Sequence, residues 1–316
     1  MKLALLFAGQ GAQHAGMGRD LYEAYPAFAA VLNDACAAVD FDLKALCFEG
    51  PEEMLTRTQY TQPCMVAFAA GVSAVLREAG VCPAAAAGLS LGEYSALCAA
   101  GVLTPVQAVR TAAFRGRAMA KAGEGRACGM AAVLGLSREA LAEACRKAAP
   151  AGCVEIANYN CPGQMSIAGD AAAVDAACTF AKEAGARRCV PLKVSGAFHT
   201  SLMAPAGDAL REYFASDAFG GWGEMAFPVY FNCTGAPMAA GESVPALLEK
   251  QVQSSVYMED TLRRMAADGV DTFLEVGPGR VLTGFVKKTV PGARALAAET
   301  AQELAQAIDA LKGESV

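Results

Sequence analysis

Short apolar segments that alternate with long helical segments constrain the fold of this chain more than any other feature. Apolar segments lie at residues 3–8, 228–231 and 272–276, and helical periodicity covers residues 105–121 and 301–311. The first apolar segment runs into a glycine-rich turn, with a helix expected from near Met17. A strand that is apolar at every position is buried on both faces, as in a parallel sheet with helices on either side. The sequence therefore predicts an α/β fold with a mainly parallel, doubly covered sheet.

The middle of the chain has a different order of elements. Strands are expected at residues 128–134, 154–157, 164–168 and 188–194, with a loop at 158–163 and helices at about 137–148 and 170–184. Ser137 and Asp170 are residue types that cap helix N-termini. The order β-α-β-β-α-β is that of the split βαβ, or ferredoxin-like, unit. We therefore expect a large α/β domain made of residues 1–125 and 196–316, with residues 126–195 inserted as a ferredoxin-like subdomain.

Charge and cysteine content exclude several classes of protein. A net charge of −6 and a pI near 5.1 argue against non-specific nucleic-acid binding, which needs clustered positive charge. The 12 cysteines form no C-x-x-C pair and only 2 histidines occur, so we expect no metal site. The N-terminal apolar run stops at Gly9, too early for a signal peptide, and no segment is long enough to span a membrane. Scattered cysteines in apolar stretches indicate a reducing compartment, and we predict a cytoplasmic protein.

The segment Gly88-Leu89-Ser90-Leu91-Gly92 matches the G-x-S-x-G pattern of a nucleophilic serine. Such a serine sits on a tight strand-to-helix turn that exposes its hydroxyl, with glycine where a side chain would clash. Residues 84–87 are expected to form the strand and residues 93–100 the helix. Because a motif of five residues also arises by chance, this context is part of the prediction.

A nucleophilic serine needs a general base, and the chain offers His14 and His199 as imidazoles. His14 lies in the first glycine-rich turn, and His199 lies in a loop of small residues directly after the expected insertion. Spacing along the chain leaves both open, and a surface or structural role is the alternative for each.

Several further motifs occur in the order found in malonyl-CoA:acyl carrier protein transacylases, which the sequence resembles from its first strand to its last helix. They are Phe7-Ala8-Gly9-Gln10-Gly11-Ala12-Gln13, the elbow at 88–94, Arg115-Gly116-Arg117-Ala118-Met119, Asn158-Tyr159-Asn160-Cys161-Pro162-Gly163-Gln164, Gly196-Ala197-Phe198-His199 and Glu275-Val276-Gly277-Pro278-Gly279. The resemblance implies an α/β-hydrolase-like large domain. It also implies acyl transfer by a ping-pong mechanism, in which malonyl passes from malonyl-CoA to acyl carrier protein through a serine ester.

The resemblance implies a role for each residue that matches a family motif. Ser90 matches the nucleophile and His199 matches its general base. Gln10 and Leu91 match the residues whose main-chain N–H groups form the oxyanion hole, which stabilises charge that develops in the transition state. Gln251 matches the residue whose main-chain carbonyl orients the catalytic histidine; the alternative is an ordinary surface glutamine.

Substrate recognition is implied for three further residues. Arg115 matches the arginine that binds the free carboxylate of malonyl, where a planar guanidinium can form two hydrogen bonds. The alternative is an exposed helix residue paired with an acid. Asn160 matches a residue of the small subdomain that faces the cleft, and Phe198 matches the residue that excludes an α-methyl branch. The chain departs from the family at Leu89, where a histidine is usual.

The implied partners are malonyl-CoA and holo acyl carrier protein, whose phosphopantetheine thiol accepts the acyl group. We expect a monomer without a bound cofactor. Carrier proteins are acidic, so basic residues are candidates for the docking surface, among them Arg187-Arg188, Arg280 and Lys287-Lys288. The alternative for each is a solvated surface.

Three other functions are alternatives to acyl transfer. A dinucleotide-binding oxidoreductase would need G-x-G-x-x-G after the first strand, but the last position is His14. A serine hydrolase shares the covalent intermediate, and Arg115 argues against it because a carboxylate clamp suits a dicarboxylic thioester. A catalytically inactive binding module is disfavoured because nucleophile, base and clamp are all present.

Overall fold

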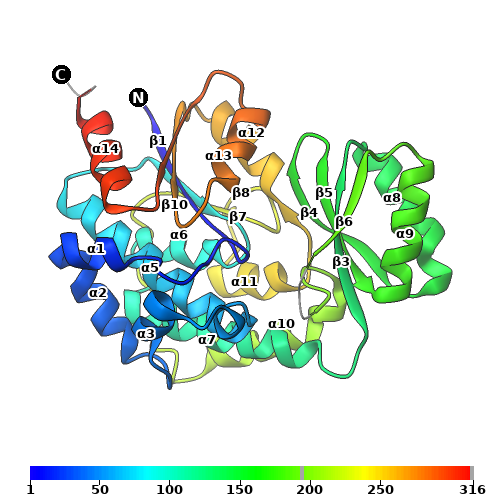
Figure 1. Ribbon diagram of the computed structural model, residues 1–316, viewed down its shortest axis with the longest axis horizontal. Helices are drawn as coiled ribbons and strands as arrows, with labels where there is room; N and C mark the ends of the chain where they lie inside the picture. Colours follow the sequence, from blue (N-terminus) through cyan, green and yellow to red (C-terminus); the bar gives the residue numbers. More distant parts are fainter. Residues whose placement is uncertain (193–195, 314–316) are drawn as a thin grey trace.

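The structure, a computed structural model, describes residues 1–192 and 196–313 and contains two β-sheets (Figure 1). Within these residues the larger sheet has six strands in the order β11 (Arg294–Ala298), β10 (Thr272–Val276), β1 (Leu3–Phe7), β2 (Ala85–Gly88), β7 (Val229–Phe231) and β8 (Ala236–Pro237). The smaller sheet has five, in the order β6 (Arg188–Pro191), β3 (Cys128–Leu134), β5 (Gln164–Asp170), β4 (Val154–Cys161) and β9 (Val256–Tyr257).

The larger sheet is parallel except at its β8 edge, as the uninterrupted apolar strands predicted. Strands β11, β10, β1, β2 and β7 pair in parallel, and only β8 joins antiparallel in the described part of the sheet. Along β1, Leu3, Leu5 and Phe7 belong to the core on one face, whereas Ala4 and Leu6 belong to the core on the other. A doubly covered sheet therefore explains why every residue of this strand is apolar.

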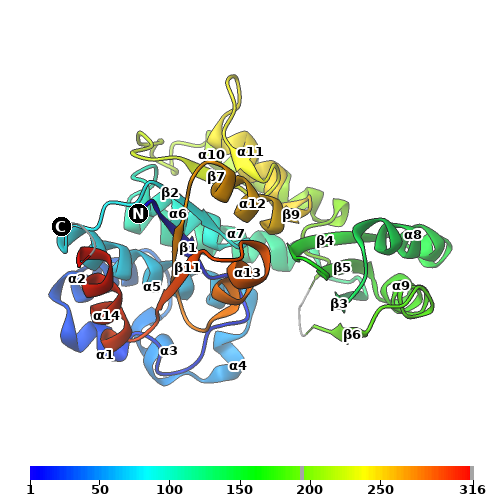
Figure 2. The ribbon, with the colours of Figure 1, turned by 90° about the horizontal axis from the view of Figure 1, so that it is seen from above.

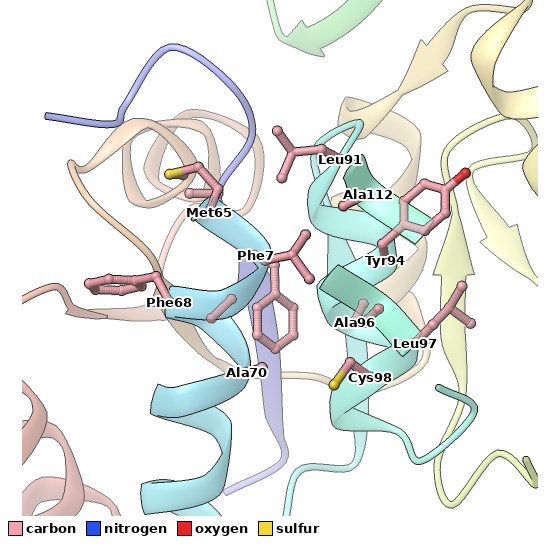
Figure 3. Packing of buried hydrophobic residues seen from close by; sticks show 14 of the residues in the cluster. Phe7, Met65, Phe68, Ala70, Leu91, Tyr94, Ala96, Leu97, Cys98 and Ala112 are labelled. Carbon is pink, nitrogen blue, oxygen red and sulfur yellow. The ribbon is translucent and has the colours of Figure 1, made fainter. Parts of the chain in front are cut away.

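Helices cover both faces of this sheet. They are α1 (Arg19–Ala24), α2 (Pro26–Cys36), α3 (Leu43–Glu49), α4 (Glu52–Leu55), α5 (Thr58–Glu78), α6 (Gly92–Ala99), α7 (Pro105–Ala122), α10 (Ala204–Ala215), α11 (Val244–Val252), α12 (Met258–Ala267), α13 (Val281–Thr289) and α14 (Ala301–Lys312), with a 3₁₀ turn at Ser201–Met203. Figure 3 shows Phe7 of β1 packed between the side chains of α5 and α6. Helices α12 and α13 contribute to the core on the opposite face.

The smaller sheet has the ferredoxin-like topology that the sequence predicted. Its chain order is β3, α8 (Arg138–Ala148), a 3₁₀ turn (Ala149–Ala151), β4, β5, α9 (Ala171–Glu183) and β6. It lies to one side of the larger sheet in both views, with α8 and α9 on its outer face (Figures 1 and 2). The short strand β9 pairs with β4 in parallel, so a segment from far beyond residue 195 completes this sheet.

Several predicted details of this unit were wrong. Strand β4 continues through the expected loop as far as Cys161, because residues 158–161 pair with β5 and β9. The Asp170 carboxylate does not cap α9; it accepts hydrogen bonds from Arg126 (2.6 and 2.9 Å) and from the Cys153 N–H (2.8 Å). Ser137 does cap α8, by accepting from the Ala140 N–H at 3.2 Å. Positions 193–194 of the expected last strand lie outside the described residues.

Side-chain hydrogen bonds add to the β4–β9 pairing in holding the smaller sheet against the larger domain. Arg138 of α8 donates to both carboxylate oxygens of Asp260 at 3.0 and 2.8 Å, and its guanidinium lies 4.7 Å from the centre of the Tyr159 ring. Ser255 donates to the Ile156 carbonyl at 2.6 Å. Strand β4 is thereby held beside the ends of the larger sheet's strands. None of the helices within the described ranges is both long and apolar enough to cross a membrane.

Candidate active site

Ser90 occupies a sharp turn between β2 and α6. Its φ of +54° lies in the left-handed region, which costs a residue other than glycine about 1–3 kcal/mol. The two flanking glycines are required sterically. A Cβ at Gly88 would lie 1.9 Å from the Gly92 carbonyl carbon, and one at Gly92 would lie 2.2 Å from the Phe7 oxygen. The G-x-S-x-G segment thus forms the predicted strand-turn-helix elbow.

His199 is the imidazole that meets Ser90. Its Nε2 lies 2.6 Å from Ser90 Oγ, and its Nδ1 lies 3.0 Å from the main-chain oxygen of Gln251. The carbonyl can only accept, so Nδ1 carries the proton and Nε2 is free to accept from the serine. His14 is 47% exposed and pairs with Glu299 at 2.9 Å. The structure therefore decides between the two histidines that the sequence left open.

The imidazole of His199 is buried and stays neutral. Burial, reinforced by the positive charge of Arg115, lowers the pKa of His199 to about 4. Both effects disfavour the charged form of a base. A neutral imidazole at physiological pH is the form that can take a proton from Ser90.

Arg115 reaches the same hydroxyl from helix α7. Its Nη2 lies 3.1 Å from Ser90 Oγ and 3.0 Å from Gln251 Oε1, while Nη1 donates to Gln62 Oε1 at 2.9 Å. The side chain is fully buried, and no carboxylate forms an ion pair with it in the part of the chain that the structure describes. The alternative of an exposed, acid-paired arginine is therefore excluded. A buried cation without a paired anion is costly, and an anionic ligand would lower that cost.

The two expected oxyanion donors lie beside the nucleophile. Gln10 follows β1 and Leu91 follows Ser90, and both line the cavity that contains Ser90 and His199. Within the described part of the chain, neither the Gln10 N–H nor the Leu91 N–H donates to a main-chain oxygen in a turn or loop. The Gln10 side chain is held by a 3.2 Å hydrogen bond to Thr58 Oγ1. Both residues thus border the cavity that contains Ser90, as their predicted role requires.

The cavity at Ser90 has a volume of about 270 Å³ and lies between the two sheets. Asn160 of β4 and Phe198 line it, and these side chains are only 8% and 7% exposed. Leu89 lines it as well, and it packs on Gly9, where a Cβ would lie 3.3 Å from the Leu89 Cβ. A second cavity of about 970 Å³ adjoins the first and shares Gln10 with it.

Sequence reasoning missed the polar residues that surround these groups. Asn232 accepts from the Ser90 N–H at 2.7 Å, and Glu93 accepts from the Asn232 N–H at 2.5 Å. Burial raises the pKa of Glu93 to about 8. The one available signal for Asn232 was its place directly after an apolar strand, since the carboxyl ends of parallel strands share the edge where sites form. Gln62, which holds Arg115, had no local signal.

The basic residues expected to form a docking surface differ in their surroundings. Arg280 forms ion pairs with Glu299 and Glu303. Lys288 lies on α13 and donates to Gln164 Oε1 at 3.4 Å, and Gln164 lines the Ser90 cavity. Lys288 therefore contacts a residue of the cavity lining. No group of three or more potential metal ligands was found within residues 1–192 and 196–313.

Comparison with known proteins places this site in a family. Residues 4–308 match the acyl transferase domain. The malonyl CoA-acyl carrier protein transacylase of Bacillus subtilis is 41% identical, with 99% of this chain and 98% of that protein covered. The Escherichia coli K12 protein of the same name is 38% identical, with 98% and 99% covered.

Solved structures agree with this assignment. The malonyl CoA-acyl carrier protein transacylase of Clostridium perfringens has a TM-score of 0.94 and 35% identity, covering 99% of this chain and 98% of that one. A malonyl-transacylase in complex with a type II PKS acyl-carrier protein has a TM-score of 0.93 and 37% identity, covering 99% and 100%. With the Ser90–His199 pair and the buried arginine in place, the chain belongs to the acyl transferase family, in the group of the malonyl CoA-acyl carrier protein transacylases.

Proposed function

We propose that this protein transfers malonyl from malonyl-CoA to the phosphopantetheine thiol of acyl carrier protein through a malonyl ester of Ser90. The observation that supports malonyl as the acyl group is the position of Arg115. Its buried guanidinium lies 3.1 Å from Ser90 Oγ and has no carboxylate partner among the described residues. An acyl group with a free carboxylate, bound as an ester of Ser90, would supply that partner. The names of the relatives support both substrates.

The first half-reaction acylates the enzyme. Ser90 Oγ attacks the thioester carbonyl carbon while its proton passes to His199 Nε2, 2.6 Å away. The main-chain N–H groups of Gln10 and Leu91 stabilise the oxyanion that forms. The carbon–sulfur bond then breaks, and coenzyme A leaves as a thiol after taking the proton from the imidazolium of His199.

The second half-reaction transfers the acyl group. The phosphopantetheine thiol of the carrier protein gives its proton to His199 as its sulfur attacks the malonyl ester. The bond between the carbonyl carbon and Ser90 Oγ breaks, and the serine recovers the proton. All the enzyme groups in this scheme come from one chain, so we propose that the protein acts as a monomer without a bound cofactor.

The proposal also includes the protein partner and the cellular compartment. The complex of a similar transacylase with a carrier protein supports acyl carrier protein as the partner. We propose Lys288, which contacts the cavity residue Gln164, as a docking residue. All 12 cysteines lie in the described part of the chain and are free, which supports a reducing, cytoplasmic compartment.

Mass spectrometry of the intact protein tests the function directly. Mixing with malonyl-CoA should add one malonyl group, which peptide mapping places on Ser90. Adding holo acyl carrier protein should remove that group and increase the mass of the carrier by the same amount. Loss of the group to water at the same rate with and without the carrier would contradict transfer and favour hydrolysis.

The low pKa of His199 predicts a simple pH dependence. Because the pKa is about 4, the base is neutral from about pH 5.5 upward, so the single-turnover rate of Ser90 acylation should be flat to about pH 7.5. It should fall only below about pH 5, as His199 takes a proton. The upper limit of this pH range, about 7.5, lies below the pKa of Glu93, which is about 8. A tenfold rise between pH 5.5 and 7.5 would indicate a base with an ordinary pKa and contradict this assignment.

Phe198 should make the site select malonyl over methylmalonyl. Its ring lines the cavity beside the base, and fitting an extra methyl into packed space costs about 1–3 kcal/mol. We expect wild type to prefer malonyl-CoA by roughly ten- to two-hundred-fold in a competition assay, and Phe198→Ser to lose most of that preference. The alternative is that Phe198 only anchors its loop, since the ring also packs in the main core. A folded variant with unchanged preference would support that alternative.

A further inference from the structure

Asn232 is a fully buried residue at the end of β7, and all of its polar groups are used. Its main-chain N–H donates to Glu93 Oε2 at 2.5 Å, and its carbonyl accepts from the Tyr257 N–H at 2.8 Å. These two bonds fix the backbone of Asn232 from both sides. The side-chain amide is therefore presented in one orientation toward the elbow.

The side-chain amide of Asn232 binds the elbow on both sides of residue 89. Nδ2 donates to the Gly88 carbonyl at 2.7 Å, and Oδ1 accepts from the Ser90 N–H at 2.7 Å. The two bonds span the turn in which Ser90 adopts its φ of +54°. A strained backbone persists only when its surroundings over-determine it, and these bonds supply two of the constraints.

The same amide is connected to the residue that holds the base. Gln251 Nε2 donates to the Ser90 carbonyl at 2.7 Å and approaches Asn232 Oδ1 at 3.4 Å. The main-chain oxygen of Gln251 accepts from His199 Nδ1. The side chains of Asn232 and Gln251 thus bind the main-chain N–H and carbonyl of Ser90. Because Gln251 also binds His199, it fixes the position of Ser90 relative to the imidazole.

We propose that Asn232 is a positioning residue for catalysis, which holds the elbow so that Ser90 Oγ points at His199 and the Leu91 N–H points into the cavity. This role rests on the proposed acyl transfer. Asn232 does not itself line the substrate cavity. Its loss should therefore slow the attack by Ser90 and leave the binding of the acyl donor unchanged.

The first variant removes the amide. Misplacement of a reacting group by about 1 Å costs on the order of a hundredfold in rate, so Asn232→Ala should lower the single-turnover acylation rate by about that factor. The malonyl-CoA concentration at half-maximal rate should change by less than about twofold. Labelling of Ser90 by a fluorophosphonate, which needs no malonyl site, should slow in parallel.

The second variant makes the clamp dependent on pH. Asn232→Asp has the same shape, and its protonated carboxyl can donate to the Gly88 carbonyl and accept from the Ser90 N–H, as the amide does. The ionised form cannot donate. Burial raises the pKa of the new carboxyl, while the positive charge of Arg115 lowers it. Glu93 is mainly uncharged below its own pKa of about 8 and adds little to either effect. Relative to wild type at the same pH, this variant should recover toward pH 5.5 and slow as the pH rises toward 7.5.

The other titratable groups near Asn232 are His199 and the Cys233 thiol, and neither mimics this recovery. His199 has a pKa of about 4 and Cys233 of about 12, so both stay neutral throughout the interval. The ratio of variant to wild type also cancels any titration that the two proteins share. The recovery therefore reports the carboxyl at position 232.

A destabilised control separates positioning from stability. Leu141→Ala opens a cavity in the core of the smaller sheet, away from the elbow, and should lower the melting temperature while acylation continues at the wild-type rate. The proposal is overturned if Asn232→Ala is acylated at the wild-type rate. It is also overturned if Asn232→Ala loses no more of the acylation rate than Leu141→Ala does at the same melting temperature. If Asn232→Ala does not fold, the pH response of Asn232→Asp decides alone, and a flat ratio overturns it. If malonyl-CoA does not acylate wild type, the proposed function fails, and the fluorophosphonate rates still test Asn232.

Discussion

Replacing Ser90 with alanine should abolish the malonyl adduct. The variant keeps His199 and Arg115 but has no oxygen to attack the thioester, so we expect acylation to fall by about 10⁵- to 10⁶-fold, the loss typical of removing a catalytic serine. The cysteines should not replace it. Burial raises the pKa of Cys98 and of Cys233 to about 12, and a buried thiol is a poor nucleophile. Intact-mass analysis after mixing with malonyl-CoA measures the result.

Ser95→Ala is the matched control for this variant. Ser95 lies on α6, a little more than one turn beyond Ser90, and its buried hydroxyl has no hydrogen-bond partner among the described residues. Its removal should leave labelling complete. An adduct that persists on Ser90→Ala and maps to a cysteine would falsify the assignment of the nucleophile.

Replacing Arg115 with alanine should remove malonyl transfer far more than acetyl transfer. Truncating one partner of a buried, hydrogen-bonded charge pair costs about 2–5 kcal/mol, so kcat/KM for malonyl-CoA should fall roughly thirtyfold to a few thousandfold. Acetyl-CoA has no free carboxylate, and its transfer should fall much less or rise. Competition between the two donors measures the change in selectivity.

Two further variants of helix α7 sharpen this test. Arg115→Lys should also be impaired, because one ammonium group cannot reproduce the separate hydrogen bonds of the guanidinium to Gln62 and Gln251. Arg117→Ala removes an exposed arginine from the same helix and should leave both donors unaffected. Equal losses for malonyl and acetyl on Arg115→Ala would show that the residue is structural, and its role as a selectivity device would be wrong.

The order of secondary-structure elements could be predicted because each signal lies within one short segment. Strand β1 is apolar at every residue, and Ser137 precedes a helical pattern, so local preferences and burial agree. The β-α-β-β-α-β order of the smaller sheet followed in the same way. Predictions failed where partners distant in sequence decide the local structure. Residues 158–161 became strand in a hairpin with β5 that the distant strand β9 completes, and Asp170 bound Arg126 instead of capping its own helix.

For the candidate site, the sequence by itself determined the elbow. Gly88, Ser90 and Gly92 lie within five positions, and the tight turn itself excludes a side chain at Gly88. The need for glycine at position 92 comes from its close approach to Phe7 of β1. The resemblance to a family then pointed to His199, Arg115 and Gln251. The residues alone left His14 and His199 equal, and the place of Asn232 after an apolar strand was too weak a signal to single it out.

Only the tertiary structure decided how these groups meet. Ser90 is separated by 109 positions from His199, by 142 from Asn232 and by 161 from Gln251. Ser90 and Asn232 converge because β2 and β7 lie side by side in a parallel sheet, which brings the carboxyl ends of both strands to one edge. Helix α11 brings Gln251 to the same edge, and His199 arrives on the loop before α10. Hydrogen bonds at that edge depend on positions in space to within a fraction of an ångström, and spacing along the chain carries no record of those positions.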